Sequence, residues 1–412
     1  MAERSETSNE GLSKRAGDHL EHLCSKIGNR CVGSEGNRAA TDYFAARMES
    51  HGFAVECPEF ECINWVQDGA RLSVQERFFT VFPSPYTLGG EVSGPLTTAP
   101  TLAELEAIRA SGSILLLRGE IAKEQLMPKN FPFFNPDNHR HIISLLERQG
   151  PLAILAATSQ DPGMAGAVSP FPLIEDGDFH IPSAYMTVGE GRELAQYAGE
   201  MASLRIIARR IPTTGYNVIA RKGDFSAGRV VLCAHIDCKE GTPGAIDNAT
   251  GITILLLVAE LLENYSGQPG IEIAALNGED YYAASGELLY LKENEGRFGD
   301  IRLGINLDGV GYYRGKTAVS LYNCPSEIEA DVRRLIAEFS GLVEGPAWYQ
   351  SDHSLFIMQG RPALAFTTDQ VEEVWTRVAH TPFDTAEIVD GGKLLETAVV
   401  LQRLLESLDR RI

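Results

Sequence analysis

The sequence has few of the features that mark secreted, membrane-bound or nucleic-acid-binding proteins. Its first 20 residues, MAERSETSNEGLSKRAGDHL, lack the apolar core of a secretory signal. The longest apolar run, GITILLLVAELL at 251–262, is shorter than the roughly 20 residues that cross a bilayer. The formal net charge of −20 argues against nucleic acid and anionic membranes as partners, since both require a basic surface. We therefore expect a soluble, cytoplasmic protein.

Cysteines are also few and irregularly placed. The chain has 7 of them, scattered from Cys24 to Cys324, which fits reduced thiols better than a disulfide framework. Cys233 and Cys238 flank His235, so a thiolate metal site is an alternative. It is the less favoured one, because a site rich in carboxylate ligands rarely needs thiolates.

The length and the changes in composition along the chain predict an insertion. A chain of 412 residues is too long for one ordinary core. Between about residues 60 and 212 the chain is rich in Pro and Gly, with short strand-like runs at 113–119, 152–158 and 183–188 and helical patterns at 137–150 and 190–201. We predict that residues 1–59 and 213–412 form the main domain and that 60–212 form an inserted, smaller α/β or β-rich domain.

Strands and helices alternate in the second half of the chain. Apolar strand-like runs at 229–236, 270–278, 302–309 and 361–368 alternate with helical patterns at 248–264, 285–296, 326–341 and 391–408. Two more helical patterns occupy 12–27 and 37–52. This order predicts an α/β fold with a mostly parallel, mixed sheet covered by helices on both faces, in three αβα layers.

Acidic and imidazole side chains follow the strands of this predicted sheet. His235 ends one strand, Glu279 and Asp280 end the next, and Asp308 ends the third. In such folds the chemistry lies at the carboxyl ends of the strands, so we expect these side chains to converge. Adjacent carboxylates repel each other and lose solvation when buried, which favours a compensating cation.

Other polar residues extend the candidate site. Asp237 lies on the same side of its strand as His235, so its carboxylate can hydrogen-bond the second imidazole nitrogen, as partners of metal-bound histidines do. Asp247 precedes a long apolar helix, where an N-cap is the alternative interpretation. Asp352 and His353 in WYQSDHSLF add further ligand types.

Motifs in nearly the whole chain outside 60–212 resemble the two-metal aminopeptidase family. That family contains bacterial leucyl aminopeptidases, glutamate carboxypeptidase II and, as one-zinc relatives, glutaminyl cyclases. The matching segments are NRCVGSEGNRAATDYFAARMESHGF (29–53), GYNVIARKG (215–223), VVLCAHIDC (230–238), GAIDNATGITILLLVAELL (244–262), LNGEDYYAASGELLYL (276–291), INLDGVG (305–311), SDHSLF (351–356), GRPALAFTT (360–368) and HTPFDT (380–385). The insert resembles the family's protease-associated domain through GSILLLRGEI, GPLAILAAT and IPSAYMTVGEGREL.

The resemblance implies a set of five metal ligands. Asp247 bridges two ions, His235 and Asp308 complete the first position, and Asp280 and His380 complete the second. Oxygen and nitrogen ligands suit two Zn²⁺ ions, with Co²⁺ or Mn²⁺ as substitutes.

The resemblance also implies roles beside the metal. Glu279 acts as the general base, and Asp237 orients the His235 ring. The family usually has Glu-Glu where this chain has Glu279 and Asp280, so the second metal position is the less secure one. Tyr349, offset by about one residue, is the candidate counterpart of the tyrosine that stabilises the oxyanion.

The resulting expectation is a metal-dependent aminopeptidase that takes a peptide substrate. A carboxypeptidase or dipeptidase of the same family remains an alternative, because specificity depends on residues outside the motifs. A one-zinc acyltransferase of the glutaminyl cyclase type is disfavoured by the long insert and the full ligand set, and an inactive scaffold by the occupied ligand and base positions. The sequence leaves homo-oligomerisation open.

Overall fold

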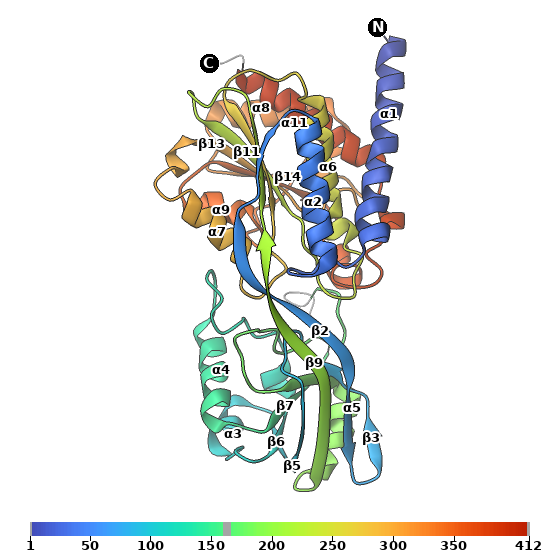
Figure 1. The fold of residues 1–412 in the computed structure, drawn as a ribbon, viewed down its shortest axis with the longest axis vertical. Helices are drawn as coiled ribbons and strands as arrows, with labels where there is room; N and C mark the ends of the chain where they lie inside the picture. Colours follow the sequence, from blue (N-terminus) through green and yellow to red (C-terminus); the bar gives the residue numbers. More distant parts are fainter. Residues whose placement is uncertain (1, 160–165, 410–412) are drawn as a thin grey trace. The chain divides into compact units, whose positions relative to one another are not determined.

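Two mixed β-sheets organise the chain, one in each of two compact units (Figure 1). The computed structural model describes residues 2–159 and 166–409. The main unit takes in Met1–Cys62, Thr214–Val374 and Val378–Ile412, and the inserted unit takes in Ile63–Thr213 and Trp375–Arg377.

The sheet of the main unit has a parallel centre and antiparallel flanks. Its strands run in the order β1 (Ala54–Glu56), β10 (Val218–Lys222), β12 (Gly270–Leu276), β11 (Arg229–His235), β13 (Ile301–Leu307), β16 (Ala363–Thr368), β14 (Thr317–Tyr322) and β15 (Leu342–Glu344). β12, β11, β13 and β16 are parallel neighbours, whereas β10 pairs antiparallel with β12 and β14 pairs antiparallel with β16. Every residue of β11 and β12 is buried, as expected for central strands covered on both faces.

Helices cover both faces of this sheet. They are α1 (Ala2–Glu21), α2 (Glu35–Ser50), α6 (Thr250–Leu261), α7 (Ser285–Glu293), α8 (Ser326–Glu338), α9 (His353–Met358) and α11 (Gly391–Asp409), with short helical turns at His22–Ile27, Ala245–Ala249, Phe298–Asp300 and Ala386–Ile388. A further helix, α10 (Val371–Arg377), begins in the main unit and ends in the inserted unit. In Figure 1, α1, α2 and α6 lie on one side of the sheet and α7 and α9 on the other. The three-layer prediction is confirmed.

The helix sequences explain this placement. α6 is buried all round from Thr250 to Ala259, because it packs on β11 and between α1 and α11. α11 instead buries one stripe, Leu394, Thr397, Ala398, Leu401, Leu404, Leu405 and Leu408, at the spacing of an amphipathic helix.

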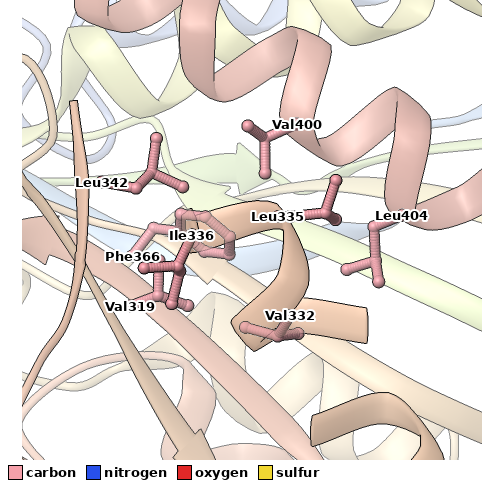
Figure 2. A pocket seen from close by; sticks show the side chains of 8 residues that line it. All are labelled: Val319, Val332, Leu335, Ile336, Leu342, Phe366, Val400 and Leu404. Carbon is pink, nitrogen blue, oxygen red and sulfur yellow. The ribbon is translucent and has the colours of Figure 1, made fainter. Parts of the chain in front are cut away.

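A small apolar cavity lies between α8, α11 and the sheet (Figure 2). Its lining consists of apolar side chains alone: Val319, Val332, Leu335, Ile336, Leu342, Phe366, Val400 and Leu404. With no polar group to orient a ligand, this cavity is a gap in the core packing rather than a substrate site.

The inserted unit has its own mixed sheet and its own core. Its strands run in the order β3 (Arg77–Phe79), β2 (Glu59–Val74), β9 (Met201–Tyr216), β5 (Gly90–Ala99), β6 (Ile114–Arg118), β7 (Ala153–Thr158), β8 (Ser183–Thr187) and β4 (Phe82–Pro83). The helices are α3 (Leu102–Ala107), α4 (Asp137–Gln149) and α5 (Val188–Leu194), with short turns at Gly119–Ala122 and Ala195–Tyr197. Apolar residues of α3 and α4 pack in one core cluster and Leu194 of α5 in another.

One element of the inserted unit differs from its prediction. The helical pattern at 190–201 yields α5, which ends at Leu194, followed by a single turn to Tyr197. Gly199 then adopts a positive φ of 92°, which reverses the chain and lets β9 begin at Met201. The similarity of this unit to a protease-associated domain stays a prediction.

Among the described residues, no helix is both long and apolar enough to cross a membrane. All 7 cysteines are free thiols.

Candidate metal centre

Three parallel strands of the main unit deliver their polar residues to one edge of the sheet. His235 is the last residue of β11, Asp308 follows β13 directly, and Glu279 and Asp280 form a turn after β12. Because the strands are parallel neighbours, their carboxyl ends meet. Asp247 enters from the helical turn Ala245–Ala249, which precedes α6.

The five residues predicted as metal ligands form one cluster. His235 Nε2 lies 3.0 Å from Asp247 Oδ1 and 3.7 Å from Asp308 Oδ1. His380 Nε2 lies 3.1 Å from Asp247 Oδ2 and 3.2 Å from Asp280 Oδ1. Each oxygen of Asp247 therefore faces one histidine, which is the arrangement that a carboxylate bridging two ions requires.

Two features of the cluster suit a metal ion: its ligand types, and its buried polar atoms that have no hydrogen-bond partner. Ligand atoms of His235, Asp247 and Asp280 all lie within 4.8 Å of one another. His235 Nε2 and Asp280 Oδ2 are buried and have no hydrogen-bond partner, which is costly for polar atoms unless a cation compensates them. Imidazole nitrogen and carboxylate oxygen are ordinary zinc ligands.

The charges of the cluster shift the protonation of both histidines. Although burial lowers it, the carboxylates of Asp237, Asp247 and Asp308 raise the pKa of His235 well above its ordinary value. Burial likewise lowers the pKa of His380, yet Asp280 and Asp247 outweigh burial and raise it to about 10. The raised pKa values favour the protonated imidazoles in the metal-free site, so an ion that binds there competes with protons.

Glu279 is half-buried beside this cluster. Burial and the negative charges of Asp308, Asp280 and Asp247, against the opposing effect of His235, hold the pKa of Glu279 well above its ordinary value. A carboxyl group with a raised pKa can take and return a proton near neutral pH, as a general base must.

Asp237 holds the turn that carries Glu279 and Asp280. Its two carboxylate oxygens accept hydrogen bonds from the backbone N–H groups of Gly278 at 2.9 Å and Asp280 at 3.0 Å. The hydrogen bond that we expected from the carboxylate to His235 is replaced by one from His235 Nδ1 to the Asp237 carbonyl oxygen at 3.2 Å. The Asp237 carboxylate lies farther from His235 Nδ1, at 3.7 Å, because it accepts hydrogen bonds from the two backbone N–H groups of the turn.

Asp384 is a buried residue of the site that the sequence did not reveal. Its carboxylate accepts hydrogen bonds from the backbone N–H groups of Ile246 at 2.7 Å and Asp247 at 3.0 Å. Burial, with the charge of Asp247, raises the pKa of Asp384 to about 7. The residue lies in HTPFDT, but nothing in the spacing of that motif indicates which backbone it would contact.

Ser351 supports Asp308 in a similar way. Its hydroxyl donates to Asp308 Oδ2 at 2.6 Å and accepts from Asn306 Nδ2 at 2.7 Å. The neighbouring His353, considered as a ligand type from the sequence, is directed elsewhere, because its Nε2 bonds the carbonyl oxygen of Trp348 at 2.8 Å. Asp352 is buried, and burial together with the charges of nearby carboxylates raises its pKa to about 7.

Three further sequence candidates lie apart from these contacts. Cys233 Sγ contacts Asn306 Oδ1 at 3.6 Å and Cys238 Sγ contacts the carbonyl oxygen of Thr242 at 3.8 Å, so both thiols have other partners. Tyr349 is 61% exposed, and its ring packs edge-on against Tyr322. Its predicted role in stabilising an oxyanion stays a prediction.

The α/β fold and the cluster of histidines and carboxylates can be compared with known proteins. Residues 217–404 match the model of Peptidase family M28. The chain is 23% identical over 355 residues to the probable leucine aminopeptidase 2 of Aspergillus fumigatus, covering 81% of this chain and 67% of that protein.

Two other proteins are similar to this chain. The probable lipoprotein aminopeptidase LpqL of Mycobacterium tuberculosis is 25% identical over 248 residues, which cover 58% of this chain and 46% of LpqL. The chain thus spans about half the length of that relative. The structure of BSAP, a zinc aminopeptidase from Bacillus subtilis, superposes with a TM-score of 0.73 over 96% of this chain and 95% of that one, at 20% identity.

Proposed function

We propose that the protein is a zinc-dependent aminopeptidase that removes N-terminal residues from peptides. The observation that carries this proposal is the convergence of two histidines on the two oxygens of one buried aspartate, with a half-buried glutamate beside them. The similarity to BSAP and to leucine aminopeptidases supports the choice of zinc and of the reaction.

We further propose that two ions bind per chain. His235, Asp308 and Asp247 would hold one, and His380, Asp280 and Asp247 would hold the other. Zinc, when bound, polarises the scissile carbonyl and lowers the pKa of water at the site. Co²⁺ and Mn²⁺ accept the same ligand types and are expected to substitute.

The side chains of the protein perform the proton transfers. Glu279 takes a proton from the attacking water and returns it to the departing amine. Asp237 keeps Glu279 in reach by holding the turn through the N–H groups of Gly278 and Asp280. A raised pKa equips Glu279 for this exchange, since a carboxylate at its ordinary pKa would release the proton to the solvent at neutral pH.

Two alternatives remain from the same family. A carboxypeptidase or dipeptidase would use the same metal centre with a different substrate pocket. A glutaminyl cyclase-like acyltransferase would need one ion, whereas the cluster offers ligands for two. We also propose a peptide as the partner and a cytoplasmic location, with homo-oligomerisation left open.

Hydrolysis of fluorogenic aminoacyl amides tests this function. We expect cleavage of substrates with a free α-amine, loss of cleavage in a chelator, and recovery on addition of Zn²⁺ or Co²⁺. N-acetylated versions of the same substrates are the matched control. Cleavage of the blocked substrates at an equal rate would exclude an aminopeptidase, and undiminished cleavage in the chelator would exclude the metal.

A further inference from the structure

A lysine contacts one of the five ligand residues of the proposed metal centre. Lys239 lies in the loop between β11 and the helical turn Ala245–Ala249. Its Nζ donates a hydrogen bond to the Asp280 carbonyl oxygen at 2.9 Å and lies 3.8 Å from Asp280 Oδ1. The lysine side chain is 25% exposed and the Asp280 side chain only 3%.

The oxygen that faces the lysine is also the one that faces a histidine. Asp280 Oδ1 lies 3.2 Å from His380 Nε2, so an ion shared with that histidine would lie beside Oδ1, and the unpartnered Oδ2 belongs to the same carboxylate. A zinc ion binds a carboxylate oxygen at about 2.0–2.2 Å. An ion on Asp280 Oδ1 therefore lies within about 6 Å of the Lys239 ammonium, given the 3.8 Å from Nζ to that oxygen.

This proximity affects the two proposed ion positions differently. A divalent ion and an ammonium group repel each other, and at about 6 Å the repulsion corresponds to about tenfold in a binding constant even at the dielectric constant of water. A lower local dielectric constant increases the effect. In the described part of the chain, no Lys or Arg side chain forms an ion pair with the ligands of the first position. His235 contacts Asp247 and Asp308, and Asp308 also accepts a hydrogen bond from the hydroxyl of Ser351.

We propose that Lys239 makes the two metal positions unequal, by weakening the ion held by Asp280 and His380 relative to the ion held by His235 and Asp308. This inference rests on the proposed metal centre. Without the second ion, the ammonium group partly neutralises Asp280 and keeps its turn in place through the carbonyl hydrogen bond. The second ion is then the one that exchanges when metal is scarce.

Zinc titration of the metal-free protein against a chromophoric chelator tests this inference without any activity readout. The variants are Lys239→Met and Lys239→Gln, which remove the charge, and Lys239→Arg, which keeps it. Lys292→Met, on the exposed surface of α7, is the matched control.

We expect two dissociation constants in the wild-type protein. Lys239→Met and Lys239→Gln should lower the dissociation constant of the weaker position by about tenfold or more and that of the tighter position by a smaller factor, while Lys239→Arg and Lys292→Met keep both constants. The inference is overturned if the two wild-type dissociation constants are equal. It is also overturned if the dissociation constant of the weaker position stays within about threefold of wild type in both neutral variants, or if both constants change by the same factor. A wild-type protein that binds no zinc at all would instead overturn the proposed function on which the inference rests.

Discussion

Asp384 offers the most quantitative test of how the site is held together. Its carboxylate accepts the buried N–H groups of Ile246 and Asp247, so Asp384→Ala leaves two buried donors without a partner. Each such donor costs about 1–3 kcal/mol. The variant also removes a carboxylate whose burial is itself unfavourable, as its pKa of about 7 shows. We therefore expect a net loss of about 2–3 kcal/mol in the free energy of unfolding.

The pH dependence of this loss has a defined sign. The pKa of Asp384 is raised in the folded chain from 3.8 to about 7, so folding favours its protonated form. Its contribution to stability is fully present below about pH 3.8 and is lost as the pH rises through about 7. In metal-free protein, the stability gap between wild type and Asp384→Ala should narrow over this range.

Denaturant unfolding of the metal-free protein at several pH values measures both effects. Asp384→Asn, which keeps one accepting oxygen, should lose less stability than Asp384→Ala and should also lack the pH dependence. Since Asp384 fixes the backbone of Asp247, zinc affinity should fall by about 10–100-fold in the alanine variant. An alanine variant with an unfolding free energy within about 0.5 kcal/mol of wild type and an unchanged zinc affinity would refute the reasoning.

Four further predictions concern the proposed ligand residues and the serine that contacts one of them. Asp280→Glu introduces the longer side chain that is usual in the family the sequence resembles. It should lower the dissociation constant of the weaker zinc position in a chelator competition. An unchanged or higher dissociation constant would show that the shorter ligand suits this site. Because the pKa of His380 is raised to about 10, zinc binding below that pH should release protons. The enthalpy of zinc binding measured by calorimetry should then vary with the ionisation enthalpy of the buffer. A binding enthalpy that is the same in all buffers would contradict a protonated metal-free site. In the metal-free protein the stabilisation from protonated His380 should be complete below about pH 6.5 and decline as the pH rises towards 10, and His380→Ala should lack this decline in thermal unfolding. Ser351→Ala removes the hydroxyl that donates to Asp308 and should weaken zinc binding by about tenfold, with retained affinity as the contrary result.

The sequence reveals those parts of the site that depend on strand ends. β11, β12 and β13 are largely apolar runs, so their approximate limits could be predicted, and the convergence of His235, Asp280 and Asp308 follows from their parallel order. Asp247 and His380 are also recognisable as ligand types in the sequence, but only the family resemblance gave their roles, since residues outside the regular strands and helices cannot be located by periodicity.

Contacts made by loop residues with distant backbone could not be predicted. Asp384 contacts a turn 137 residues earlier in the chain, and Lys239 contacts Asp280 41 residues later. Such contacts depend on loop conformation, for which the pattern of residues carries little signal. β2 and β9 are a different case, because each alternates buried and exposed residues over only part of its length, and the half-exposed remainder gives no strand signal.

Glu279→Gln tests the central claim most directly, because it removes the proposed base and leaves the ligand residues in place. Zinc content and turnover of a free-amine aminoacyl amide should be measured on the same preparation, with wild type as the control. We predict two zinc ions per chain, as in wild type, and a kcat lowered by about 10²–10⁴-fold, the usual contribution of general base catalysis. A variant that keeps both ions and hydrolyses the substrate at a rate near that of wild type would contradict the account.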